Sequence, residues 1–258
     1  MVSTTEMAAN SKGPRLWPEP LLAVTNGVVD REALADLAGK SILNPRQLDR
    51  RTVTAIAQLA ALLESRNVEM DKPLDGKIAI TAFFEASTRT RLSFESAVLR
   101  LDGKVLSVPD GQVTGIAKGE SIADIGEMFN TYGDVVIMRH PDTNSMEEIS
   151  KNLHRPLINA GNGSGHHPTQ ALIDWYALLK WRPDLSRIIC PADKQIHIGI
   201  IGTPGSMRAV KSFLRLALMF AGSVKKITII SELADPVGLD LTEPIEESPI
   251  PIDITNDV

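Results

Sequence analysis

The sequence predicts an α/β protein built from two doubly wound parallel-sheet domains. From residue 77 onward, short apolar segments typical of buried strands alternate with segments of helical periodicity. The same strand–turn–helix order begins again after Pro183. Polar residues follow several predicted strands directly, at the sheet edge where parallel α/β folds bind their ligands.

The chain begins with a segment that we expect to be an extended or disordered arm. Residues 1–20 are polar and contain three prolines, which disfavours a packed core. Residues 30–37 and 44–67 have helical patterns, and the second has a broad apolar face. That face consists of Val53, Ile56, Ala57, Ala60, Leu62 and Leu63.

A buried strand is predicted at residues 77–83, directly after Asp75-Gly76. A helix follows it, because apolar residues recur there at i, i+3, i+4 and i+7 before a stop at Gly103. These residues are Phe94, Ala97, Val98 and Leu101. Residues 87–90 therefore lie where free backbone N–H groups and the positive end of the helix dipole meet. Hydroxyls and an arginine at that point form a cradle suited to phosphate.

The rest of the first domain continues the alternation. Strands are predicted at 104–108, 134–138 and 156–159, and helices at 120–132, 145–152 and 168–181. The helix at 120–132 should turn Ile122, Ile125, Met128 and Phe129 inward. The loop at 109–118 contains two glycines, and its length suggests mobility.

The second half has a strand at 195–201, a helix at 207–220 and further strands at 226–230 and 250–254. The turn at 202–205 matches a dinucleotide fingerprint only weakly, because the third glycine is missing. We place an N-terminal arm at residues 1–35, a first domain at 36–182 and a second at 183–258.

The composition excludes several classes of function. The 258 residues carry a net charge of −5 without a long basic run, which argues against a nucleic-acid surface. Cys190 is the one cysteine, so an intrachain disulfide and a cysteine-rich zinc site are excluded. No signal peptide or membrane span is visible, and we expect a cytoplasmic protein without a membrane partner.

The segment from Phe83 to Glu95 reads FFEASTRTRLSFE. A lone Ser-Thr pair would indicate only a helix cap, but the whole string resembles the carbamoyl-phosphate motif of the aspartate and ornithine carbamoyltransferases. Its Phe-Phe-Glu start is more similar to the aspartate enzymes, as is the stretch NAGNGS at 159–164 followed by HPTQ at 167–170. The resemblance implies transfer of a carbamoyl group from carbamoyl phosphate to L-aspartate, an early step of pyrimidine synthesis that needs no metal or cofactor.

The same resemblance implies roles for ten residues. The phosphate ligands would be Ser87, Thr88, Arg89, Thr114 and Lys118, and Arg139 would contact both the phosphate and the carbamoyl oxygen. Thr114 stands where the family commonly has serine. Donors to the carbamoyl oxygen, and thus the catalytic groups, would be Thr90, Arg139 and His167. Gln170 would fix the carbamoyl NH₂ group and Arg208 the amino-acid carboxylate, whereas His166 is expected to be a bystander.

The resemblance is strong from about residue 77 to 180, is weaker from 195 to 230, and then stops. Family members continue with further helices and strands, including a loop whose arginine binds the side-chain carboxylate of the amino acid. We therefore expect the second domain to be incomplete within these 258 residues. In the family the loop that carries Lys118 reaches a neighbouring subunit, which implies a homotrimer with shared sites.

Two alternatives stay open at this point. The acceptor could be ornithine or another amine, although the NAGNGS stretch argues against ornithine. The chain could also be a non-catalytic structural or regulatory homologue. A regulatory partner subunit is a further candidate partner.

Overall fold

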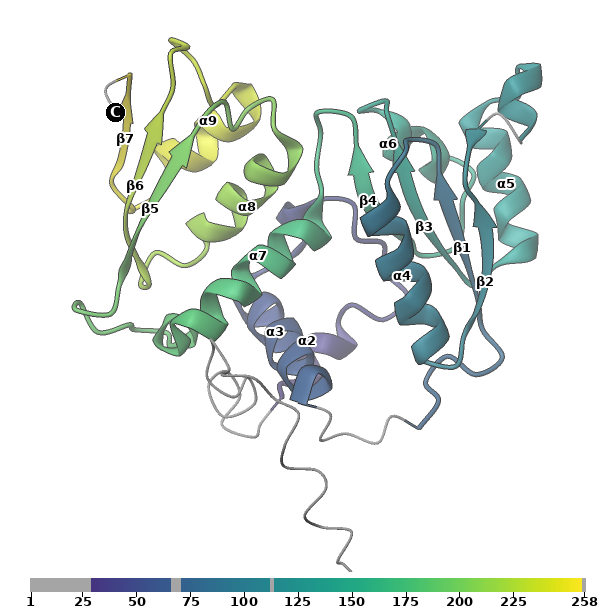
Figure 1. The fold of residues 1–258 in the computed structure, drawn as a ribbon, viewed down its shortest axis with the longest axis horizontal. Helices are drawn as coiled ribbons and strands as arrows, with labels where there is room; N and C mark the ends of the chain where they lie inside the picture. Colours follow the sequence, from purple (N-terminus) through teal and green to yellow (C-terminus); the bar gives the residue numbers. More distant parts are fainter. Residues whose placement is uncertain (1–28, 66–70, 112–113, 257–258) are drawn as a thin grey trace, which may run out of the picture.

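The computed structural model describes residues 29–65, 71–111 and 114–256, which form two parallel sheets side by side (Figure 1). The predicted arm at residues 1–20 lies outside this range. The chain enters through α2 (Arg31–Ala35), the short 3₁₀ helix η1 (Pro45–Gln47) and α3 (Arg50–Ser65). The predicted α/β class with parallel sheets is confirmed, and the second sheet is the smaller one.

The first sheet has four parallel strands in the order β2-β1-β3-β4. They are β1 (Ile78–Phe83), β2 (Lys104–Val108), β3 (Val135–His140) and β4 (Leu157–Asn162). The helices that follow them are α4 (Thr88–Arg100), α5 (Ile122–Tyr132), α6 (Ser145–Ser150) and α7 (Pro168–Trp181). The carboxyl ends of β1, β3 and β4 thus meet at one edge.

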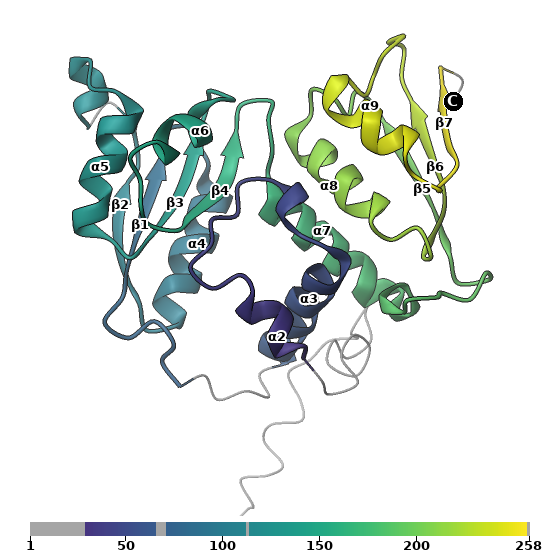
Figure 2. The same ribbon diagram turned by 180° about the vertical axis from the view of Figure 1, so that it is seen from behind.

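Alternation along β1 explains how this sheet is covered on both faces. Ile80 and Ala82 pack in the cluster that includes Ile125 of α5, whereas Ala79 and Phe83 pack with Val98 of α4. Successive side chains of a strand point to opposite faces. As a result α4 lies on one face, and α5 and α6 lie on the other (Figure 2).

The second sheet has the order β5-β6-β7, again all parallel. Its strands are β5 (Ile196–Ile201), β6 (Val224–Ile230) and β7 (Ile252–Thr255), and its helices are α8 (Arg208–Leu218) and α9 (Leu239–Glu246). The 3₁₀ helix η4 (Pro183–Ser186) leads into it from α7.

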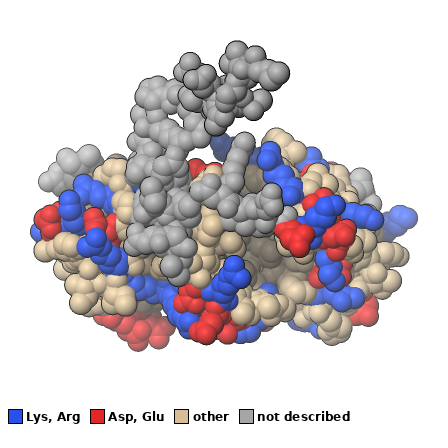
Figure 3. All heavy atoms as spheres, turned by 90° about the horizontal axis from the view of Figure 1, so that it is seen from below, with Lys and Arg blue, Asp and Glu red and all other residues tan. Residues whose placement is uncertain are grey.

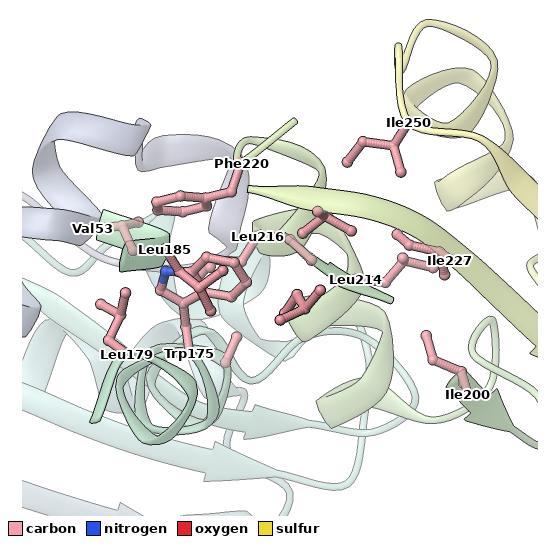
Figure 4. Packing of buried hydrophobic residues seen from close by; sticks show 14 of the residues in the cluster. Val53, Trp175, Leu179, Leu185, Ile200, Leu214, Leu216, Phe220, Ile227 and Ile250 are labelled. Atoms are coloured by element: carbon pink, nitrogen blue, oxygen red, sulfur yellow. The ribbon is translucent and has the colours of Figure 1, made fainter. Parts of the chain in front are cut away.

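The largest hydrophobic core joins the two halves of the chain. Trp175 of α7 is fully buried beside Phe220, with ring centroids 4.2 Å apart. Val53 of α3 and Leu214 of α8 belong to the same cluster (Figure 4). This core includes residues on both sides of position 183, so α3 and α7 pack against the second sheet. The domain limits predicted from the sequence stay a prediction.

Three details of the sequence-based prediction were wrong. Met128 is 42% exposed instead of inward, since α5 turns its Ile125 and Phe129 to the sheet. Leu63 is 40% exposed, because α3 buries a narrower face formed by smaller residues. The buried residues of α3 are Thr52, Val53, Ala55, Ala57 and Ala61. Finally, residues 239–246 form the helix α9, where no helix was predicted.

The described surface carries acidic and basic side chains interspersed, without a continuous basic field on the face shown in Figure 3. In the described part of the chain, no helix is both long and apolar enough to cross a bilayer. Within residues 29–65, 71–111 and 114–256, no three His, Cys, Asp or Glu side chains are grouped to hold a metal ion.

Candidate active site

A cleft of about 1050 Å³ opens at the carboxyl edge of the first sheet and extends to the start of α8. It is lined by the β1–α4 turn and one face of α4, the end of β3, the N-cap and first turns of α7, and the first residues of α8. Eight of the ten predicted site residues line it, namely Ser87, Thr88, Arg89, Thr90, Arg139, His167, Gln170 and Arg208. The fold therefore brings together residues that are up to 121 positions apart in the sequence (208 minus 87).

The start of α4 supplies the anion-binding end of the cleft. Ser87 is the N-cap residue in extended backbone (φ −160°, ψ 96°), and its hydroxyl makes no capping hydrogen bond with the described residues. The first N–H groups of α4 have no intrahelical acceptor and point out of the helix beside Arg89. A phosphate placed there would meet backbone donors, hydroxyls and a guanidinium.

Glu85 links two arginines that lie on different halves of the molecule. Its Oε1 accepts hydrogen bonds from Nη2 of Arg139 and Nη2 of Arg208, both at 2.8 Å, and its Oε2 accepts one from Nη1 of Arg208 at 2.8 Å. Arg208, followed by Arg139, holds the pKa of Glu85 below its ordinary value against the opposing effect of burial. The carboxylate thus fixes both guanidinium groups at the edge of the cleft.

Glu85 is the functional residue that the sequence reasoning missed. The signal was present, since Glu85 comes two residues after the end of β1, Arg139 lies at the end of β3, and Arg208 begins α8. Gly161 explains how the arginines fit beside the β4–α7 turn. A Cβ at Gly161, whose φ is +115°, would lie 3.2 Å from Nε of Arg208 and 3.3 Å from Nη1 of Arg139. A side chain there would be strained and crowded.

The β4–α7 turn is held by two buried asparagines. Asn159 accepts a hydrogen bond from the Gly161 N–H at 2.7 Å. Its Nδ2 donates at 2.9 Å to Oδ1 of Asn162, which also accepts the His166 N–H at 2.9 Å. Side-chain amides therefore replace the backbone partners that this irregular turn lacks, and they fix the backbone that presents His167.

His167 is 6% exposed and is the N-cap of α7. Burial, and secondarily the charges of Arg139 and Arg208, lower the pKa of His167 to about 4. Its Nδ1 accepts the Gln170 N–H at 3.3 Å, which assigns the proton of the neutral ring to Nε2. From α8, Oγ of Ser212 accepts the His167 N–H at 2.9 Å. The ring is therefore a neutral hydrogen-bond donor that lines the cleft.

The other two predicted residues lie apart from this cleft. Thr114 is half-buried and its Oγ1 donates to the Gly111 carbonyl at 2.6 Å. Lys118 ends a short 3₁₀ helix, Gly115–Lys118, and is exposed. Neither belongs to the residues that line the cleft, so this chain alone does not bring them to the α4 cradle.

Comparisons with known proteins agree with this arrangement. The sequence model of the aspartate/ornithine carbamoyltransferase carbamoyl-P binding domain matches residues 40–180. The aspartate carbamoyltransferase catalytic subunit of Picrophilus torridus is 43% identical over 149 residues, which are 58% of this chain and 46% of that subunit. The catalytic subunit of Alkaliphilus oremlandii is 35% identical over 221 residues, 85% of this chain and 64% of the relative. The chain thus spans only 46% and 64% of the length of these two curated relatives.

Solved structures give the same result. Aspartate transcarbamoylase from Trypanosoma cruzi in complex with N-(phosphonacetyl)-L-aspartic acid is similar with a TM-score of 0.74 and 33% identity, covering 86% of this chain and 68% of that chain. The ligand-free form has a TM-score of 0.74 and 31% identity. The matched domain comprises more than half of the residues and includes the α4 cradle, Arg139, His167 and Gln170. The chain therefore belongs to the aspartate/ornithine carbamoyltransferase family.

Proposed function

We propose that this chain carries the carbamoyl-phosphate site of a carbamoyltransferase that acts on L-aspartate and forms N-carbamoyl-L-aspartate and phosphate. The observation that carries the proposal is the convergence of the α4 N-terminus, Arg139 and a neutral, proton-donating His167 on one cleft. These groups match the two ends of carbamoyl phosphate, since an anion cradle faces the phosphate and a neutral donor faces the carbonyl.

In the proposed reaction the uncharged amine attacks the carbamoyl carbon and forms a tetrahedral oxyanion. Thr90, Arg139 and His167 donate hydrogen bonds to this oxygen, where negative charge develops. The C–O bond to phosphate then breaks, and the leaving phosphate takes up the proton of the amine. Ser87, Thr88 and Arg89 hold the phosphate, so that catalysis rests on orientation and electrostatics.

Arg208 is the proposed ligand of the amino-acid carboxylate. Its guanidinium already binds one carboxylate, that of Glu85, in a two-pronged geometry, which is the geometry that a substrate carboxylate would use. We prefer aspartate over ornithine as the acceptor for two reasons. The relatives named above are aspartate enzymes. Arg139 and Arg208 at the edge of the cleft would also repel the cationic side-chain amine of ornithine. A non-catalytic homologue is disfavoured because eight of the ten predicted site residues line one cleft.

We further propose a homotrimer in which Thr114 and Lys118 complete the site of a neighbouring subunit. Two observations support it. Both residues lie outside the cleft of their own chain, and α4 exposes Leu92 (53%) and Leu99 (60%) one above the other. Exposed apolar side chains on one helix face favour a protein contact. We also propose domain limits at residues 36–182 and 183–258, and a regulatory subunit as a further partner.

The cradle is tested by Arg89→Ala, with Arg91→Ala as the matched control on the same helix. Arg89 lines the cleft and Arg91 does not. One charge-assisted contact contributes about 1.5–3 kcal/mol, so Arg89→Ala should weaken phosphate binding about 10- to 100-fold in calorimetry. Arg91→Ala should bind as the wild type does. Equal phosphate affinity of Arg89→Ala and wild type would show that the cradle is misplaced.

A further inference from the structure

Asp174 lies outside the proposed set of site residues and yet contacts a member of it. It is on α7, one helical turn after Gln170, and its Oδ1 accepts a hydrogen bond from Nε2 of Gln170 at 2.9 Å. Gln170 lines the cleft, whereas Asp174 stands behind it, outside the lining. The pair thus couples a half-buried carboxylate to a side chain that faces the ligand.

The chemistry of the two groups determines the orientation of the amide. A side-chain amide has a donating NH₂ and an accepting oxygen on opposite sides, and coordinates alone rarely distinguish them. An ionised carboxylate only accepts, so Asp174 selects the orientation in which the NH₂ group of Gln170 faces it. Oε1 of Gln170 is then turned away from Asp174, and no described residue donates a hydrogen bond to it.

We propose that Asp174 is a positioning residue that holds Gln170 with its amide oxygen toward the cleft, so that the site selects an acyl phosphate bearing an NH₂ group. This inference rests on the proposed function and identifies the residue that makes the site select carbamoyl phosphate over other acyl phosphates. The amide oxygen would accept a hydrogen bond from the carbamoyl NH₂. Acetyl phosphate has a methyl group at that place and cannot donate one.

Without Asp174 the orientation of Gln170 is no longer specified. In Asp174→Asn the new side-chain amide has the shape of the original carboxylate, but it can either donate a hydrogen bond to the oxygen of Gln170 or accept one from its nitrogen. Part of the population would then present NH₂ to the NH₂ of the ligand, which is a donor facing a donor. The loss should fall on ligands with an NH₂ group and spare those without one.

The test compares three ligands, carbamoyl phosphate, acetyl phosphate and inorganic phosphate, by calorimetry and steady-state kinetics on the whole protein. We expect the wild type to prefer carbamoyl over acetyl phosphate and Asp174→Asn to lower that preference about five- to tenfold. Affinity for inorganic phosphate should stay within about twofold. Asp174→Ala provides a second variant without a polar group. Glu148→Gln, which removes an exposed helical ion pair on α6, is the matched control.

A double-mutant cycle completes the design. Gln170→Ala should lower the same preference, and adding Asp174→Asn to it should lower it no further. The inference is overturned if Asp174→Asn and Asp174→Ala keep the preference, or if they weaken all three ligands equally, as the loss of a merely helix-stabilising pair would. A wild type that binds phosphate but neither prefers nor transfers the carbamoyl group would refute the proposed function itself, and with it this role.

Discussion

At the residue scale, the site depends on which groups are kept neutral and which are charged. His167 is buried next to two guanidinium groups, and its Nδ1 is occupied by the Gln170 N–H. Both effects favour the neutral ring with its proton on Nε2. A donor of fixed tautomer is suited to a developing oxyanion, because it needs no reorganisation as charge appears.

His167→Ala should therefore lower kcat far more than it raises KM for carbamoyl phosphate, since the hydrogen bond strengthens in the transition state. Loss of one oxyanion donor costs about 10²–10³ in rate. His166→Ala is the matched control, because burial lowers the pKa of the neighbouring His166 to about 4 as well, but its ring does not line the cleft. Steady-state kinetics would refute the role if His167→Ala kept kcat and changed only KM.

The phosphate cradle was predicted from residue types at a strand–helix turn, and the other candidate ligands were implied by the family resemblance, but the partners of these side chains were not predicted. The strings around Arg89, Arg139 and His167 indicate chemistry that is local in the sequence. The contact between Glu85 and Arg208 joins residues 123 positions apart, and no local pattern sets the orientation of a long side chain over that distance. The same holds for the bond from His167 to Ser212.

At the element scale, α9 shows why one helix was not predicted. It contains Pro244, which cannot donate to the carbonyl of Asp240, four residues before it. The guanidinium of Arg215 on α8 donates to that carbonyl instead, and Lys211 pairs with the Asp240 carboxylate at 3.2 Å. The helix therefore depends on tertiary contacts that a sequence pattern does not show. Strands and longer helices were found because their periodicity is local.

Glu85 is an element-scale link, since it joins the turn after β1 to the end of β3 and to α8. Glu85→Gln should lower the free energy of unfolding at pH 7 by about 1–3 kcal/mol. The folded-state pKa of Glu85 lies below the unfolded value of 4.5. Its contribution is thus present above pH 4.5 and is lost as the pH falls through the folded-state pKa.

Urea denaturation of wild type and Glu85→Gln at neutral and acid pH measures this contribution. The difference between the two should be largest at pH 7 and should shrink in acid. Glu148→Gln, which breaks the 2.6 Å pair with Lys151 where both side chains are about half exposed, should have almost no effect. A Glu85→Gln difference that is absent at pH 7, or constant with pH, would contradict the proposed link.

At the scale of the whole molecule, the cleft lies between the edge of the first sheet and the start of α8, and each sheet has hydrophobic clusters of its own. Helix α7 carries His167 and Gln170 at its start and Trp175 in the core that supports the second sheet. Helix α7 therefore connects the cleft to the core of the second sheet. The sequence predicted both sheets, but it did not predict that α3 and α7 would pack against the second sheet. An apolar helix face shows that the helix packs against something, but not which element that is.

A shared site makes a prediction about mixed oligomers. Arg89→Ala and Lys118→Ala should each be inactive alone, because each removes one part of every site. After joint dissociation and reassembly, some interfaces would pair an intact cradle with an intact Lys118, and partial activity should return. Each variant taken alone through the same cycle is the control. Mixed oligomers that are confirmed by mass but remain inactive would show that Lys118 serves its own subunit.

The central claim, carbamoyl transfer to aspartate, is tested most directly by identifying the product. The protein is incubated with radiolabelled carbamoyl phosphate and either L-aspartate or L-ornithine, and the labelled products are separated by chromatography. We predict N-carbamoyl-L-aspartate with aspartate, no citrulline with ornithine, and loss of the product in Arg89→Ala but not in Arg91→Ala. Formation of citrulline, or of neither product by a protein that binds carbamoyl phosphate, would contradict the account.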